Sequence, residues 1–141
     1  MDFNSLSRFL TAQEYAYDIA LTEIHRARKR THWMWYIFPQ LRSLGKSERS
    51  YFYGIADIEE AKAYLDHPIL GSRLIEISET LLHIQGISAQ DIFGDIDSMK
   101  LHSSMTLFAV VGGDDSIFHK VIDKYFDGKM DENTLKILNN N

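Results

Sequence analysis

The sequence predicts an all-α protein, built as a compact single-domain bundle of several helices. Helix-start signals recur along the chain, apolar residues after Pro68 repeat at helical spacing, and only two prolines interrupt 141 residues. A chain of this length suits one domain. We therefore expect a single helical domain over residues 1–141, with its core in about residues 5–126 and a frayed tail at Asn139–Asn141.

The first two expected helices begin at capping boxes. Thr11 and Glu14 have the spacing of such a box, which opens a helix over about residues 12–30. Its last turns are basic, as the helix macrodipole favours at a C-terminus. A second box, Asp57–Glu60, opens a short helix that ends near Asp66.

The next helix is expected from Pro68 to about Gln85, because proline is well tolerated at a first helical position. Its core residues are spaced four, three, four and three apart: Leu70, Leu74, Ile77, Leu81 and Ile84. Ile75 and Leu82 broaden this stripe, so we expect burial on nearly two sides. Gly86 is expected to form a left-handed C-terminal cap.

Glycines frame the helix that carries most of the later apolar residues. A short turn capped at Ser88 ends at Gly94, and Asp95 or Asp97 is expected to cap the helix that follows. This helix runs to Val111, before a pair of glycines. Residues 105–111 have the composition of a buried strand, but the cap and the glycine stop favour a helix.

Two shorter helices complete the prediction. Asp115–Ser116 begins one, which Asp127–Gly128 closes, and a weak last helix follows Asp131.

Positive charge is concentrated in one segment of an acidic chain. The net charge is −5, yet residues 24–47 contain no Asp or Glu and six of the fifteen basic residues. This charge distribution indicates a local anion site rather than a broad nucleic-acid-binding surface. The position of part of this cluster at a helix end is an alternative explanation.

Several classes of site are excluded or disfavoured. Without cysteine there is no disulfide, thiolate metal site or cysteine nucleophile. No Gly-x-Ser-x-Gly elbow or phosphate-binding loop is present, and we expect no cofactor. Glu76, Glu79 and His83 lie opposite the core stripe, so no metal site is expected. No apolar run has membrane-spanning length and the N-terminus does not look like a signal peptide, so we expect a cytoplasmic protein without membrane association.

The first candidate site is the aromatic segment His32–Gln40, which contains both tryptophans. Aromatic rings beside cationic side chains can stack on a base and hold a phosphate. The alternative is that these rings are buried in the core. The candidate ligand-binding residues in and around this segment are Arg28, Lys29, His32, Trp33, Trp35 and Lys46.

The second candidate is the helix over residues 97–108. Lys100, Ser103 and Ser104 share one face of it, one turn from an N-terminus that attracts anions. The alternative assigns the serines to close helix packing and Lys100 to solvent. A lysine in a buried helix needs a partner, which Asp95 or Asp97 can supply.

The chain resembles a known bacterial family. The residues that carry this resemblance are His32–Gln40, Leu44–Ser47, His67–Leu74, and Ile92–Gly94 through Lys100 to Phe108. They are similar to the domain-of-unknown-function family eighteen-ten, whose members are often mislabelled calpastatin, over roughly residues 5–126. The resemblance implies a mainly α-helical fold and no particular activity. Members commonly have glycine where this chain has Ala27, which favours a longer first helix here.

Three functions remain open on these observations. The leading hypothesis is a binding protein or an enzyme for a small anionic ligand, nucleotide-like or phosphorylated, in a pocket formed by the aromatic-basic segment and the helix that carries Lys100. The second is a non-catalytic module that binds a protein partner. The third, single-stranded nucleic-acid binding, is disfavoured by the net charge of −5.

Overall fold

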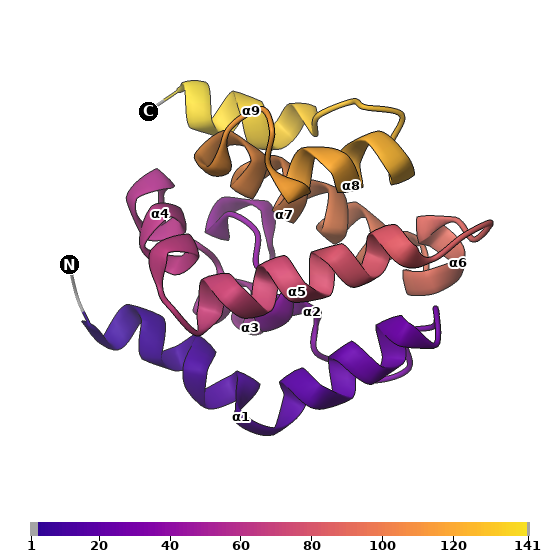
Figure 1. The fold of residues 1–141 in the computed structure, drawn as a ribbon. Helices are drawn as coiled ribbons and strands as arrows, with labels where there is room; N and C mark the ends of the chain where they lie inside the picture. Colours follow the sequence, from indigo (N-terminus) through magenta and orange to yellow (C-terminus); the bar gives the residue numbers. More distant parts are fainter. Residues whose placement is uncertain (1–2, 141) are drawn as a thin grey trace.

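The computed structural model describes residues 3–140, and within them the chain forms nine α-helices, one 3-10 turn and no strand. The prediction of an all-α fold is therefore confirmed. The three longest helices are α1 (Phe3–His25), α5 (Leu70–His83) and α7 (Asp95–Gly112). Helix α5 lies between α1 and α8 and contacts both (Figure 1).

Shorter elements fill the space around these helices. They are α2 (Met34–Ile37), η1 (Arg42–Leu44), α3 (Glu48–Tyr53), α4 (Ile58–Asp66), α6 (Ala89–Phe93), α8 (Ile117–Tyr125) and α9 (Glu132–Asn139). A single parallel bridge between Leu41 and Ile55 holds the two ends of the η1–α3 segment together. The elements α2, η1 and α3 are absent from the sequence prediction, because each is too short to show a periodic apolar pattern.

Four predicted helix starts have the expected side-chain caps. The side chains of Asp57, Ser88, Ser116 and Asp131 each accept a hydrogen bond from the backbone amide three residues ahead. Helix α7 differs, because Gly94 occupies its N-cap and neither Asp95 nor Asp97 caps it. Both aspartates lie in its first turn, where the helix dipole still favours them.

Helix α1 differs from its prediction at both ends. It begins at Phe3, so Thr11 lies inside the helix and does not mark its start. A continuous buried face explains the extension, since Leu6 and Phe9 pack in the core together with Tyr17 and later residues. The helix ends at His25 rather than near Arg30, so Ala27 does not prolong it.

Helix α5 follows its predicted stripe in part. Leu70, Leu74, Ile77 and Leu81 are buried and Leu82 packs against the core, whereas Ile75 is exposed. Ser78 and Thr80 are also buried, so the buried face of the helix is broad. Gly86 has the expected positive φ of 74°, but the helix has already ended at Ile84, whose backbone is extended.

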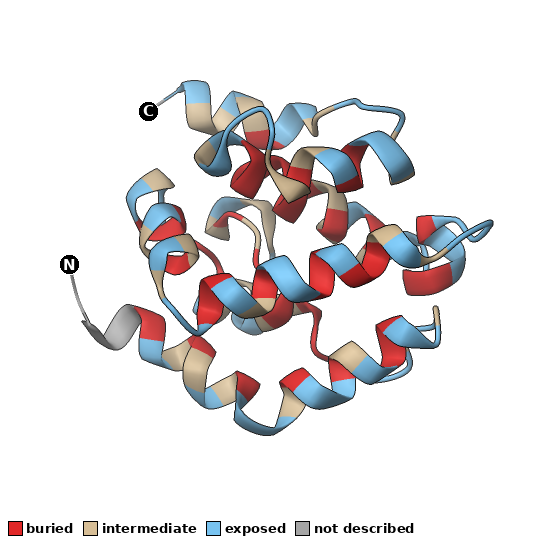
Figure 2. Ribbon diagram, viewed as in Figure 1, coloured by how far each residue is buried: buried red, intermediate tan, exposed pale blue. Residues whose placement is uncertain are grey.

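The core gathers around the C-terminal part of α7 (Figure 2). Leu101 and residues 103–109 are buried, so this stretch of the helix is enclosed on nearly all sides. At the other end of the chain, Thr134 of α9 is buried and the helix continues through Asn139; Asn141 of the expected tail lies outside the described residues. Among the described helices, none combines the length and apolar character needed to cross a membrane.

Candidate functional site

A cavity of about 360 Å³ opens where three separate parts of the chain meet. The loop after η1 supplies one wall with Leu44, Gly45 and Lys46. The N-terminal half of α7 supplies the second with Ile96, Met99, Lys100, His102 and Ser103. The start of α9 supplies the third with Asp131 and Asn133, and Gln40 and Ser50 complete the lining.

Close packing fixes the first wall. A Cβ on Gly45 would overlap the Cβ of Ser50, so only glycine allows the loop to approach α3 this closely. Ser47 caps α3 by accepting a hydrogen bond from the Ser50 amide at 3.1 Å, and its hydroxyl also bonds the Ser50 hydroxyl at 2.9 Å. The loop that carries Lys46 is therefore held at both ends.

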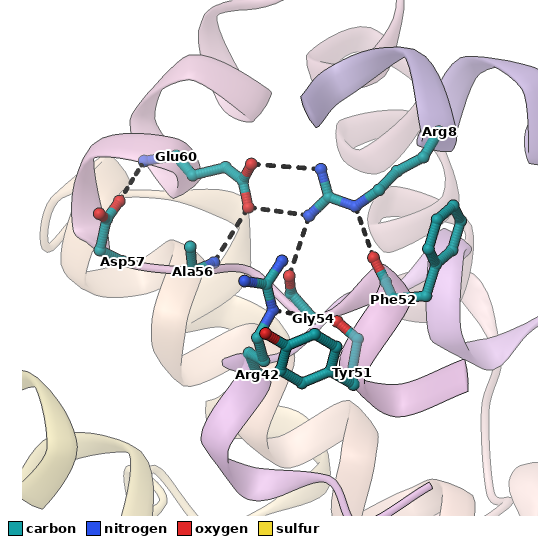
Figure 3. A network of polar contacts seen from close by, with 8 residues as sticks. All are labelled: Arg8, Arg42, Tyr51, Phe52, Gly54, Ala56, Asp57 and Glu60. Carbon is teal, nitrogen blue, oxygen red and sulfur yellow. Dashed lines mark hydrogen bonds and ion pairs between the residues drawn. The ribbon is translucent and has the colours of Figure 1, made fainter. Parts of the chain in front are cut away.

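A buried ion pair anchors α3 from the other side (Figure 3). Arg8 of α1 donates to both carboxylate oxygens of Glu60 on α4, at 2.9 and 3.2 Å. The same guanidinium donates to the carbonyls of Phe52 at 2.7 Å and Gly54 at 2.9 Å, at the end of α3. Side-chain exposures of 8% and 9% mark the pair as structural, and none of these groups lines the cavity.

Lys46 and Lys100 place positive charge on two walls of the cavity. Lys100 lies 3.7 Å from the Asp97 carboxylate, so the predicted pairing with Asp95 or Asp97 is made with Asp97. Asp97 also binds Lys29, at the shorter distance of 2.9 Å. The Lys29 side chain is 7% exposed and that of Lys100 is 23% exposed, so Asp97 is chiefly the partner of Lys29 and leaves Lys100 available to a ligand.

Where α7 meets the start of α9, the cavity lining carries a hydroxyl, an imidazole and a carboxylate. Ser103 donates to the Met99 carbonyl at 3.1 Å and lies 3.5 Å from Asp131 Oδ2. The His102 ring stacks on Phe126 with centroids 4.2 Å apart, and its Nε2 lies 2.5 Å from the Lys129 carbonyl. A carbonyl only accepts, so Nε2 carries the proton and Nδ1 is the nitrogen able to accept one.

Trp35 lies beside the cavity, in a crevice of about 10 Å³ that shares Gln40, Ser50 and Lys100 with it. The Lys100 ammonium and the Arg49 guanidinium each lie 5.1 Å from the centroid of the Trp35 ring. These are cation–π distances. Trp35 thus orients Lys100, and the crevice itself is too small for a ligand ring.

The structure separates the remaining predicted residues from the cavity. Trp33 is in the core, where its Nε1 donates to Glu23 at 2.9 Å, and Arg28 and His32 are exposed away from the cavity lining. Lys29 is committed to Asp97 and to the Thr31 carbonyl at 2.6 Å. Ser104 is fully buried, and its hydroxyl has no hydrogen-bond partner among the described residues.

The Glu23 carboxylate organises the chain around Trp33 rather than a site. It accepts four hydrogen bonds, from the amides of Arg30 and Thr31, the Thr31 hydroxyl and the Trp33 indole. Burial alone would raise the pKa of Glu23, but these hydrogen bonds together lower it to about 2. The segment after α1 is therefore held by a side chain that is ionised at neutral pH.

Of the nine predicted residues, Lys46, Lys100 and Ser103 meet in the cavity, and Trp35 lies next to it. Sequence reasoning missed His102, Asp131 and Asn133, although His102 adjoins the predicted serines. Asp131 was recognised only as a helix cap, a role it also has. No local signal places α9 against α7, so the contribution of α9 to the cavity could not be predicted from the sequence.

A second, wider cleft of about 530 Å³ lies over α5 and the end of α1. Glu76, Glu79 and His83 line it, and His25 of α1 joins them. Glu76 accepts a hydrogen bond from the Tyr17 hydroxyl, and no cluster of three His, Asp or Glu in the described residues has the arrangement of a metal site. This cleft lacks lysine and arginine, so it does not suit an anion.

Comparison with known proteins places the chain in a family. The model described as "Protein of unknown function (DUF1810)" matches residues 3–138. The crystal structure of the conserved hypothetical protein Rv1873 from Mycobacterium tuberculosis is similar, with 44% sequence identity and a TM-score of 0.94 over 98% of this chain and 99% of that chain. No curated protein matches. The family match extends beyond the residues that carry the resemblance in the sequence and confirms it: the chain belongs to the DUF1810 family.

Proposed function

We propose that the cavity between α7, the η1–α3 loop and the start of α9 binds a small anionic ligand, nucleotide-like or otherwise phosphorylated. The observation that carries this proposal is the meeting of Lys46, Lys100 and Ser103 in one concavity of about 360 Å³. This volume lies in the range of small-molecule pockets. Two lysines in one cavity are conspicuous in a protein of net charge −5.

The charge balance supports an anion. Lys46 has no ion-pair partner among the described residues, and Lys100 shares Asp97 with Lys29. Two ammonium groups that line one cavity without full compensation repel each other, and a bound anion offsets that repulsion. Ser103 adds a hydroxyl that can hydrogen-bond a polar group of the ligand. Phosphorylated metabolites are cytoplasmic compounds, so we also propose that the protein acts in the cytoplasm.

A thermal-shift and calorimetric titration with inorganic phosphate and a panel of phosphorylated metabolites tests the proposal. A bound ligand at a hundred times its dissociation constant stabilises the fold by about 2.7 kcal/mol. Lys46→Met should abolish most of this stabilisation. Lys62→Met is the matched control, because Lys62 is exposed on α4, lies outside the cavity lining, and changes net charge equally. Equal losses in both variants, or no binding by any anion, would overturn the proposal.

A second candidate function is a module that binds an acidic protein partner. Tyr51 and Phe52 are exposed side by side on α3, close in sequence to Lys46 and Arg49. Exposed aromatic residues flanked by basic ones are typical of interaction surfaces. The double variant Tyr51→Ser, Phe52→Ser tests this second function. If these two side chains form a protein-binding surface, the variant should lose binding of the protein partner in a pull-down, while its affinity for small anions should stay unchanged.

A further inference from the structure

We infer that the ligand of this cavity is a nucleoside monophosphate, with its phosphate at Lys46 and Lys100 and its nucleoside against the apolar residues and Asp131 of the lining. This inference rests on the proposed function and narrows it. Two features of the lining carry it, because neither is explained by an anion alone.

The first feature is an apolar rim. Ile96 and Met99 line the cavity from the first turns of α7, yet 73% of Ile96 and 70% of Met99 are exposed. Leu44 lines the same cavity from the loop. Large apolar side chains left in water beside a cavity gain free energy when a ligand covers them. A thioether also packs well against an aromatic ring, so a planar base suits this rim better than a sugar does.

The second feature is the Asp131 carboxylate, which repels an anion in the same cavity. Its hydrogen bonds from the Thr134 amide (3.0 Å), the Thr134 hydroxyl (2.6 Å) and Ser103 (3.5 Å) all go to Oδ2. These contacts leave Oδ1 able to accept a hydrogen bond from a ligand. A ligand that fits must therefore carry hydrogen-bond donors for Asp131 in addition to its anionic group.

A nucleoside monophosphate meets both conditions, since its base is planar and apolar-faced and its base and ribose carry N–H and O–H donors. A sugar phosphate has donors but cannot cover the apolar rim. A fatty acid covers the rim but brings no donor to Asp131. The volume of about 360 Å³ lies near the lower end for small-molecule pockets, which favours a mononucleotide over a dinucleotide.

Calorimetric titration with adenosine, guanosine, cytidine and uridine 5′-monophosphates, ribose 5-phosphate and inorganic phosphate tests this inference. We expect at least one nucleotide to bind about tenfold or more tighter than ribose 5-phosphate, the ratio that about 1.4 kcal/mol of base contact produces. Met99→Ser should lower that nucleotide's affinity several-fold and leave the affinity for inorganic phosphate unchanged. Met99 is exposed, so this variant should fold.

Asp131→Asn should change the affinity for the nucleotide and the affinity for inorganic phosphate in opposite directions. Asparagine also caps helices, so α9 should remain in place. The loss of negative charge should weaken binding of the nucleotide and strengthen binding of inorganic phosphate. Equal affinities for ribose 5-phosphate and every nucleotide would overturn this inference and leave the proposed function standing. Failure of all six compounds to bind the folded protein would overturn both.

Discussion

Ala27 ends helix α1 in a conformation that suits glycine. Its φ is +56°, in the left-handed region. The Arg28 amide bonds the Glu23 carbonyl at 3.0 Å and the Ala27 amide bonds the Ile24 carbonyl at 2.8 Å, which is the Schellman pattern. The surrounding contacts thus impose the cap despite the cost of a Cβ at positive φ.

Replacing Ala27 with glycine should therefore stabilise the protein. Relief of left-handed strain is worth about 1–2 kcal/mol and the added freedom of the unfolded chain costs about 0.4–1 kcal/mol, so we expect a net gain of roughly 0.5–1 kcal/mol. Urea denaturation measures it. Ala16→Gly, inside α1, should instead destabilise by about 1 kcal/mol. A loss of similar size in both variants would contradict this account of the cap.

Glu23 makes part of the stability depend on pH. Its pKa is lowered to about 2 in the folded protein, below the ordinary value of a glutamate, so ionised Glu23 stabilises the fold above pH 4.5. This contribution is lost as pH falls from 4.5 toward 2. Glu23→Gln keeps the shape and loses the charge, so it should be less stable than the wild type at neutral pH.

The measurement is the difference in free energy of unfolding between wild type and Glu23→Gln at pH 7 and near pH 2.5. We expect the difference to shrink at the lower pH. A difference that does not vary with pH would show that the charge of Glu23 has no part in holding Trp33 and the chain after α1.

Helices whose start is encoded by a single capping residue are the ones that the sequence predicts well. Asp57, Ser88, Ser116 and Asp131 act locally, within one turn, so their effect needs no knowledge of the fold. Thr11 has the same signal and fails, because burial of Leu6 and Phe9 outweighs a cap worth about 1 kcal/mol. Ser47 was an available signal for α3 that the prediction overlooked.

The ion pair between Arg8 and Glu60 should be the strongest polar link between α1, α3 and α4. Arg8→Ala removes four hydrogen bonds and leaves the Glu60 carboxylate without its guanidinium, at a cost of about 3–5 kcal/mol. Combining it with Glu60→Gln should cost less than the sum of the single changes, because the two residues act as one unit. Additive losses in chemical denaturation would contradict this coupling.

At the scale of the whole molecule, the cavity depends on contacts that no local pattern encodes. Lys100 and Ser103 were found because they share a helix face, and Lys46 because it belongs to the basic segment. Their meeting with Asp131 requires α9 to return onto α7, and nothing short-range in the sequence specifies that return. The aromatic segment His32–Gln40 has a strong local signal but contributes little to the cavity, since Trp33 is buried in the core and Trp35 only borders the cavity.

The most direct test of the central claim is a residue-resolved map of binding, from amide ¹H–¹⁵N chemical shifts during titration with inorganic phosphate and then with a nucleoside monophosphate. We predict that the perturbed amides cluster at Lys46, Lys100, Ser103 and Asn133, which are far apart in sequence and adjacent only in this fold. Perturbations centred on Arg28 and His32 in the exposed segment after α1, or spread over every exposed lysine, would contradict the assignment of the site to this cavity.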